Sequence, residues 1–187
     1  MSRKNFGAKP YSYPQPVLIV ASYDENGVPD AMNAAWGGIS YDNEISICLG
    51  SDHKTVKNIL LNKAFTVSMA DAAHIEACDY LGMVSANDVP DKLAKSGLTV
   101  SKSDLLNAPI INELAVCIEC RMKSYDEATC RMVGEIVNVS VDEAFITDGK
   151  TDTSKISPVT FDPFNNEYYV IGRKVADAFS AGSALIK

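Results

Sequence analysis

Residues 15–40 read QPVLIVASYDENGVPDAMNAAWGGIS, an apolar run that turns back on itself. The first part, 15–24, is rich in the β-branched residues that strands favour. It leads into Asn26-Gly27, and Asn-Gly is the strongest short-range signal for a β-hairpin turn. PDAMNAAWGGIS then returns as a second strand. The stretch therefore predicts an antiparallel hairpin near the start of the fold.

Outward from this hairpin, the chain continues mainly as predicted strands. We expect strands over 44–49, 65–70, 114–125, 129–141, 159–163 and 167–172. We expect helices over 54–62, 71–82 and, in the tail, 174–181, and an irregular segment over 83–113 with one helical turn near 91–95. At least seven strands joined by hairpin-length loops indicate a mainly β fold, an antiparallel barrel with a few short helices.

Composition limits the partners and the compartment. The 187 residues, 47% of them apolar, are enough for a single domain over 1–187, with an N-terminal arm (1–13) and a C-terminal tail (174–187). The 24 acidic residues outnumber the 17 basic ones, which argues against nucleic acid or an anionic membrane as a partner. No apolar run reaches the ~20 residues of a membrane span, and the N-terminus lacks a signal peptide. We expect a cytoplasmic protein.

The five cysteines are expected to be free thiols, because the count is odd and no secretory signal is present. Cys117 and Cys120 match C-x-x-C, but they lie in an alternating stretch where positions i and i+3 point to opposite faces. We therefore predict neither a disulfide nor a metal site there. Cys78 is expected to be a buried, inert thiol, and a redox role is the alternative.

The segment LGSDHKTVKNI (49–59) leads from a strand into a helix. The first turn of a helix leaves backbone N–H groups unpaired and favours an anion. Polar side chains that can donate to an anion cluster here: Ser51, His53, Lys54, Thr55, Lys57 and Asn58. One interpretation is a phosphate site. The other is that Ser51 or Asp52 merely caps the helix and the lysines are solvated.

The only tryptophan, Trp36, lies among alanines and glycines in MNAAWGG (32–38). Small residues allow a planar ring to approach the backbone, Asn33 offers a donor and an acceptor, and Trp36 offers a flat wall. The alternative is a tryptophan packed beside a glycine bulge with no ligand. Together with the phosphate interpretation, this slot has the shape required by a flavin mononucleotide.

Several further stretches, in order, resemble the flavin reductase-like family of FMN-binding split barrels, within it the flavoredoxin-like branch. The similar stretches are YPQPVLIVASYDENGVPDAMNAAWGGIS, HKTVKNI, FTVSMA, ACDYLGMVSANDV, SGLT, LNAPIINELAVCIEC, VGEIVNVSVDEAF and SPVTFDP. They span roughly residues 10–180. The family pattern often has Ser-Gly where this chain has Ser85-Ala86. The resemblance implies a split barrel that forms homodimers, with FMN close to the subunit interface.

The resemblance also implies which residues hold FMN, in four groups along the cofactor. Asn33, Ala34, Ala35 and Trp36 would line the isoalloxazine, while Leu49, Gly50 and Ser51 would follow the ribityl chain. Lys54, Thr55 and Asn58 would hold the phosphate. Asp79 and Tyr80 would approach from a neighbouring helix or from the partner subunit, and Lys92 would supply a second positive charge.

The implied activity is an FMN-dependent oxidoreductase. Hydride would come from NADH or NADPH, and the electrons would pass to a free flavin or a protein acceptor. Because the flavin carries the chemistry, no catalytic acid or base is predicted. One alternative is an electron-transfer or FMN-carrier protein with no nicotinamide reaction of its own, since no dinucleotide fingerprint is present. Another is a structural barrel without flavin.

Overall fold

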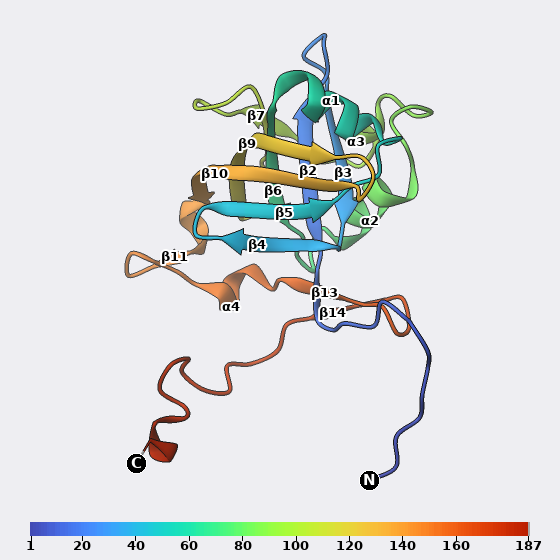
Figure 1. Cartoon of the computed structure of the whole chain (residues 1–187). Coiled ribbons are helices and arrows are strands. Elements are labelled where there is room, and N and C mark those ends of the chain that lie inside the picture. Colours follow the sequence, from blue (N-terminus) through green and yellow to red (C-terminus); the bar gives the residue numbers. More distant parts are fainter. Residues whose placement is uncertain (187) are drawn as a thin grey trace.

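The computed structural model describes residues 1–186 and builds them around one seven-stranded antiparallel sheet (Figure 1). The strands lie in the order β3-β2-β6-β9-β10-β5-β4. Their bounds are β2 Leu18–Tyr23, β3 Pro29–Ala34, β4 Gly37–Tyr41, β5 Glu44–Cys48, β6 Ala64–Met69, β9 Val116–Asp126 and β10 Arg131–Val141. The predicted mainly β class is confirmed, and so are the first hairpin and the long hairpin β9–β10.

The sheet curls until its two edges meet. β3 and β4 are the two edge strands, yet only Ala35 and Trp36 separate them in the chain. β4 pairs with β5, and the Cys48 N–H donates to the Trp36 carbonyl at 2.8 Å. A sheet whose edges are joined by two residues must close on itself, so the predicted antiparallel split barrel is present.

One predicted strand, PDAMNAAWGGIS, is therefore wrong, because the chain bends within it. The second half leaves β2 and pairs with the far edge of the sheet. Gly37 permits this: a Cβ there would lie 2.8 Å from the Ser46 carbonyl oxygen, so only glycine lets β4 start this close to β5.

The barrel interior is apolar, and helix α1 (Lys54–Asn62) packs against it. The sequence predicted a helix with these bounds. Val56 and Ile59 of this helix are fully buried against strand residues that include Phe65. Phe65 lies directly against Gly134 of β10, where a Cβ would come within 2.5 Å of the Phe65 ring. The interior is thus packed around a glycine that leaves room for an aromatic ring.

A second apolar layer covers the outer face of β2 and β3. Ile19 and Ala21 point into this layer, whereas Leu18 and Val20 point into the barrel. The layer is built by α2 (Ile75–Met83), α3 (Lys92–Lys95) and the hairpin of β7 (Val100–Lys102) and β8 (Pro109–Ile111). The helical turn near 91–95 is confirmed, but the prediction that the rest of 83–113 is irregular is wrong. Strands of three residues are too short to show a periodicity.

The last part of the chain forms a separate small sheet beside the barrel. β13 (Val159–Asp162) pairs with both β1 (Gln15–Pro16) and β14 (Glu167–Val170). The remaining elements are η1 Glu143–Phe145, β11 Ile146–Thr147, β12 Lys150–Thr151, α4 Thr153–Ile156 and η2 Ser183–Leu185. Within residues 1–186, the model contains no helix of the length and apolarity needed to cross a membrane.

The predicted tail helix over 174–181 is wrong. This part of the chain consists of extended backbone and turns, and only Ser183–Leu185 form a short 3-10 helix. Val175 and Phe179 are fully exposed. A helix of eight residues is stable only when one of its faces packs against the rest of the protein. Neither Val175 nor Phe179 packs against the barrel. Figure 1 shows the tail and the N-terminal arm leaving the barrel on the same side.

All five cysteines are free thiols, and three of them lie deep in the protein. Burial raises the pKa of the Cys78 and Cys120 thiols to about 12 and that of Cys117 to about 11. Cys48 is exposed. The reactive species is the thiolate, so a higher pKa and burial both slow the reaction.

Iodoacetamide at pH 8 should therefore label Cys48 first. We expect Cys78, Cys117 and Cys120 to react at least about a hundredfold more slowly, given their smaller thiolate fraction. Peptide mass spectrometry of timed samples measures the rates, and protein unfolded in urea, where the thiols should react alike, is the control. Rapid labelling of Cys78 in the folded protein would show that it is accessible and would revive a redox role for it.

Candidate functional site

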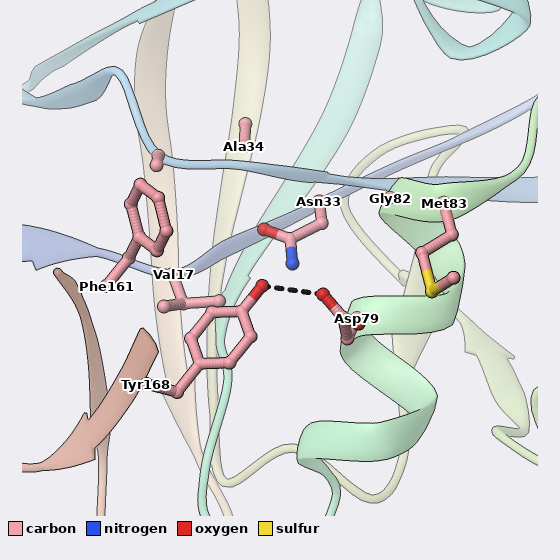
Figure 2. A pocket seen from close by; sticks show the side chains of 9 residues that line it. Val17, Asn33, Ala34, Asp79, Gly82, Met83, Phe161 and Tyr168 are labelled. Carbon is pink, nitrogen blue, oxygen red and sulfur yellow. Dashed lines mark hydrogen bonds between the residues drawn. The ribbon is translucent and has the colours of Figure 1, made fainter. Parts of the chain in front are cut away.

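Two adjoining cavities form a trough between β3 and α2. The first has a volume of about 260 Å³ and the second about 400 Å³. Both are lined by Asn33, Gly82 and Met83, so they lie side by side. The first is also lined by Val17, Ala34, Ala35, Asp79, Phe161 and Tyr168, and the second by Met32, His53, Leu81, Val84, Ser85 and Lys92 (Figure 2 shows the first cavity).

Small residues line the two opposite walls of the trough. Ala34 and Ala35 lie at the end of β3, beside the bend that closes the barrel. On the opposite wall, a Cβ at Gly82 would lie only 3.0 Å from the Cβ of Asn33. Gly82 thus lets α2 approach β3 closely while leaving an open slot. Walls of alanine and glycine suit a flat ligand. The sequence analysis predicted this for the wall that MNAAWGG (32–38) forms.

One end of the trough is polar. The Tyr168 hydroxyl of β14 donates to Asp79 Oδ1 of α2 at 2.7 Å (Figure 2). Asn33 Nδ2 donates to the Cys78 carbonyl at 3.3 Å. Burial, followed by the hydrogen bond to Asp79, raises the pKa of Tyr168 to about 12. Tyr168 is therefore neutral at physiological pH. The sequence analysis missed Tyr168 and Phe161, since nothing local in β13 or β14 marks them as site residues.

The other end of the trough opens onto the start of α1. His53 is the N-cap residue, and in the described part of the chain no side chain caps the first turn and no acidic residue lies in it. Lys54 and Lys57 bring positive charge to this turn. Lys57 Nζ lies 3.4 Å from Asn87 Oδ1, on the loop after α2. Unpaired helix N–H groups with positive charge beside them form an anion-binding end.

The turn Leu49–Ser51 leads into this end of the trough. The Leu49 side chain lies in the barrel core, so only its backbone faces outward. Tyr125 of β9, which the sequence analysis missed, donates its hydroxyl to the Leu49 carbonyl at 2.7 Å and lies beside Ser51. Gly50 and Ser51 are half-buried. Tyr125 thus fixes the turn that the resemblance assigns to the ribityl chain.

The three predicted phosphate residues do not turn their side chains into the trough. Thr55 is buried and donates its hydroxyl to Asp30 Oδ2 at 2.6 Å. Asn58 is buried as well, and Lys54 Nζ lies 3.4 Å from Glu25. Lys54 and Asn58 line a separate cavity of about 120 Å³, together with Asp30. At the trough, a phosphate would meet the backbone of α1 rather than these side chains.

Lys92 is enclosed by oxygen atoms. Its side chain is only 4% exposed, and its Nζ lies 3.1 Å from the carbonyls of Leu81 and Val84 and 3.6 Å from Asp30 Oδ1. The ammonium has three protons, and these three oxygens face all of them. Burial lowers the pKa of Lys92, and the charge of Asp30 opposes that shift. Lys92 thus joins the end of α2 to β3 behind the trough wall.

Two other predicted residues lie apart from the trough. Trp36 is 43% exposed on the bend between β3 and β4. Its position on the outer surface leaves its ring available to a ligand or to another chain. Tyr80 is half-buried on α2, lies near Lys95 and lines neither cavity of the trough. No group of three or more potential metal-binding side chains occurs within residues 1–186.

A curled antiparallel sheet with a ligand-sized trough beside its bend defines the split-barrel class of flavin reductase-like proteins. A model of the flavin reductase like domain matches residues 11–153, so the chain belongs to this family. The solved flavoredoxin of Desulfovibrio vulgaris (Miyazaki F) is 36% identical, with 97% of this chain and 100% of that chain covered and a TM-score of 0.92.

Other relatives are more distant. A flavoredoxin structure from Methanosarcina acetivorans is 24% identical, with both chains fully covered and a TM-score of 0.89. An uncharacterized protein of Aeropyrum pernix is 24% identical over 117 residues. That match covers 62% of this chain and 44% of the relative, so the chain spans less than half of that relative's length.

Proposed function

We propose that the protein binds FMN in the trough and acts as an oxidoreductase that accepts hydride from NADH or NADPH. The observation that carries this proposal is a pair of adjoining cavities with alanine and glycine in their walls, the second of which reaches His53 at the uncapped start of α1. FMN, when bound, supplies a two-electron acceptor whose electrons can pass to a free flavin or a protein. The similarity to a flavoredoxin and the family membership support a flavin in this position.

The residues present fit FMN along its whole length. Ala34, Ala35 and Gly82 line the cavity that would hold the ring, and Asn33 would meet its edge. The turn over Gly50 and Ser51 would run along the ribityl chain. At the α1 end, backbone N–H groups with Lys57 and His53 nearby would hold the phosphate, and Lys54 would add charge at longer range. The chain's own task is to bind, orient and shield the ring.

A titration of flavin-free protein with FMN and with riboflavin tests this proposal. We expect stoichiometric quenching of flavin fluorescence, with FMN at least tenfold tighter than riboflavin, because a charge-assisted hydrogen bond to phosphate contributes about 1.5–3 kcal/mol. Lys57→Gln should reduce that preference, whereas Lys63→Gln, at the other end of α1, should not. Equal affinity for both flavins would show that α1 does not bind the phosphate. If neither flavin binds, the protein is a structural barrel without flavin.

A second function, electron transfer without a nicotinamide reaction, is favoured by the 36% identity to a flavoredoxin. A structure with 18% identity and a TM-score of 0.65 is described as an NADH:FAD oxidoreductase of Streptomyces globisporus in complex with NAD and FAD fragments, a likeness of fold alone. Anaerobic mixing of the FMN-loaded protein with NADH and with NADPH separates the two functions. Loss of the visible flavin absorbance supports the reductase, and an unchanged spectrum supports the carrier.

We further propose that two copies form a homodimer through their terminal arms. Residues 1–13 and 171–186 leave the barrel on one side and expose Phe6, Val175 and Phe179 to solvent (Figure 1). These two arms carry five of the chain's 17 basic residues and one of its 24 acidic residues. Basic, apolar arms complement the acidic body of a second copy.

The double substitution Val175→Ser with Phe179→Ser should weaken such a dimer at least about a hundredfold, since each buried side chain contributes about 1.5–3 kcal/mol. Sedimentation velocity over a range of protein concentrations measures the effect. Ser180→Thr, a polar change in the same tail, is the matched control. If the wild-type protein sediments as a monomer with FMN bound, the dimer proposal is wrong.

A further inference from the structure

The polar end of the trough presents hydrogen-bond acceptors and few free donors. The only proton of the Tyr168 hydroxyl is already donated to Asp79. One amide proton of Asn33 is donated to the Cys78 carbonyl. The Asn33 side chain also forms a hydrogen bond with the Tyr168 hydroxyl. What remains for a ligand is the second oxygen of Asp79 and the Asn33 carbonyl. Figure 2 shows the three side chains converging from β14, α2 and β3.

This end of the trough also carries a negative charge. Asp79 is the one acidic side chain among the residues that line the first cavity, and Tyr168 stays neutral. The opposite end of the trough lies at α1, where His53 lines the second cavity and Lys57 lies in the first turn of the helix. The trough therefore runs from a positive end to a negative end, and an anionic group is stabilised at one and repelled at the other.

Aromatic rings and small residues enclose the acceptor groups. The Phe161 and Tyr168 rings lie 5.9 Å apart and form one wall, and Val17 and Ala34 line the same cavity. Both rings come from β13 and β14, which lie beyond the residues 11–153 that the family model matches. A flat slot with apolar walls and acceptors at its end suits the edge of a planar heterocycle.

We propose that Asp79 selects a planar heterocycle edge that carries N–H donors and no negative charge, and that it excludes a carboxylate from this position. The proposal rests on the proposed function, since it names which ligand chemistry the trough accepts. Two sources offer such an edge: the imide N–H of a flavin ring and the carboxamide of a nicotinamide. An anionic aromatic acid matches neither the charge nor the hydrogen bonds.

Two pairs of probes distinguish the sources. The first pair, riboflavin and 3-methylriboflavin, differs only at the imide N–H and is titrated into flavin-free protein. The second pair, nicotinamide and nicotinate, differs only in the carboxamide and the carboxylate and is titrated into FMN-loaded protein by calorimetry. Both pairs are measured for the wild type, Asp79→Asn and Glu76→Gln. Glu76 is exposed on the same helix and is the matched control for the loss of one charge.

We expect the wild type to prefer the N–H probe at least tenfold in one pair, and Asp79→Asn to reduce that preference at least tenfold. Glu76→Gln should leave it unchanged. A change confined to the flavin pair assigns the flavin edge, and one confined to the nicotinamide pair assigns the carboxamide. Tyr168→Phe should retain the preference, since Asp79 keeps its charge and gains a free lone pair.

The inference is overturned if Asp79→Asn changes the preference in neither pair, or if Glu76→Gln changes it equally. Unfolding by urea of each variant verifies that it is folded before titration. If FMN does not bind the wild type, the proposed function fails separately. The nicotinamide and nicotinate pair is then measured on flavin-free protein, where a preference that depends on Asp79 still supports the selection.

Discussion

Replacing Lys92 with methionine is expected to lower the free energy of unfolding by about 3–5 kcal/mol, because removing one partner leaves the other charge buried and uncompensated. Asp30 is almost fully buried, and its Oδ1 has the Lys92 ammonium 3.6 Å away as its nearest compensation. The substitution also removes both hydrogen bonds from Nζ to the end of α2. Urea denaturation followed by circular dichroism measures the change.

Two further variants make this prediction specific. Lys95→Met, on the same short helix, removes an exposed pair with Asp91 and should leave the unfolding midpoint almost unchanged. Asp30→Asn combined with Lys92→Met should cost less than the two separate losses added together, since the neutral amide needs no counter-charge. Full additivity would contradict a direct interaction between the two side chains.

Gly134→Val is expected to be similarly damaging, at about 3 kcal/mol or more. A Cβ at this position would come within 2.5 Å of the Phe65 ring and 3.1 Å of the Cys120 Cβ, in the closed interior of the barrel. Overpacking of this kind commonly costs about 1–3 kcal/mol for added methylenes and more where strands cannot move apart. Gly134→Ala should lie below it in the same series.

The second half of this test is a rescue. Phe65→Leu removes the atoms that the new side chain would meet, so the double variant with Gly134→Ala should be more stable than additivity predicts. Gly38→Val is the control for placing a branched side chain in a strand, because the space around Gly38 is open. If Gly38→Val and Gly134→Val cost the same, the close contact with Phe65 is not the cause.

Much of the fold follows from local pattern. The Asn26-Gly27 turn, the alternation in 116–141 and the helix over 54–62 are properties of neighbouring residues, and each predicted element is present. The bend at Ala35 and Trp36 is different. It depends on the pairing of β4 with β5, which in turn pairs with β10. Strand β10 lies far from both in the sequence, so no short stretch of sequence predicts the bend. The same limit applies to the unpacked tail, whose apolar spacing resembles that of a helix.

The site shows the same limit at the level of side chains. The residues at the start of α1 are of the types that bind phosphate. In the structure, however, Thr55 lies on the inward face of the helix and donates to Asp30, which belongs to β3. Sequence spacing alone could not reveal that partner. Tyr168 and Asp79 are 89 residues apart in the chain and meet only because β14 folds back beside α2. The sequence predicted that Ala34 and Ala35 line the slot. The opposite wall, which includes Gly82, is evident only from the tertiary structure.

The two-residue link between β3 and β4 also bears on solubility. An open sheet normally has two separate edges, and each can recruit a strand from another molecule and start aggregation. Here both edges flank one seam, and the trough runs along β3 beside it. A ligand in the trough would cover the place where edge-to-edge association can begin. Ligand occupancy and resistance to aggregation should therefore rise together in this protein, as linkage requires for any ligand that binds only the folded chain.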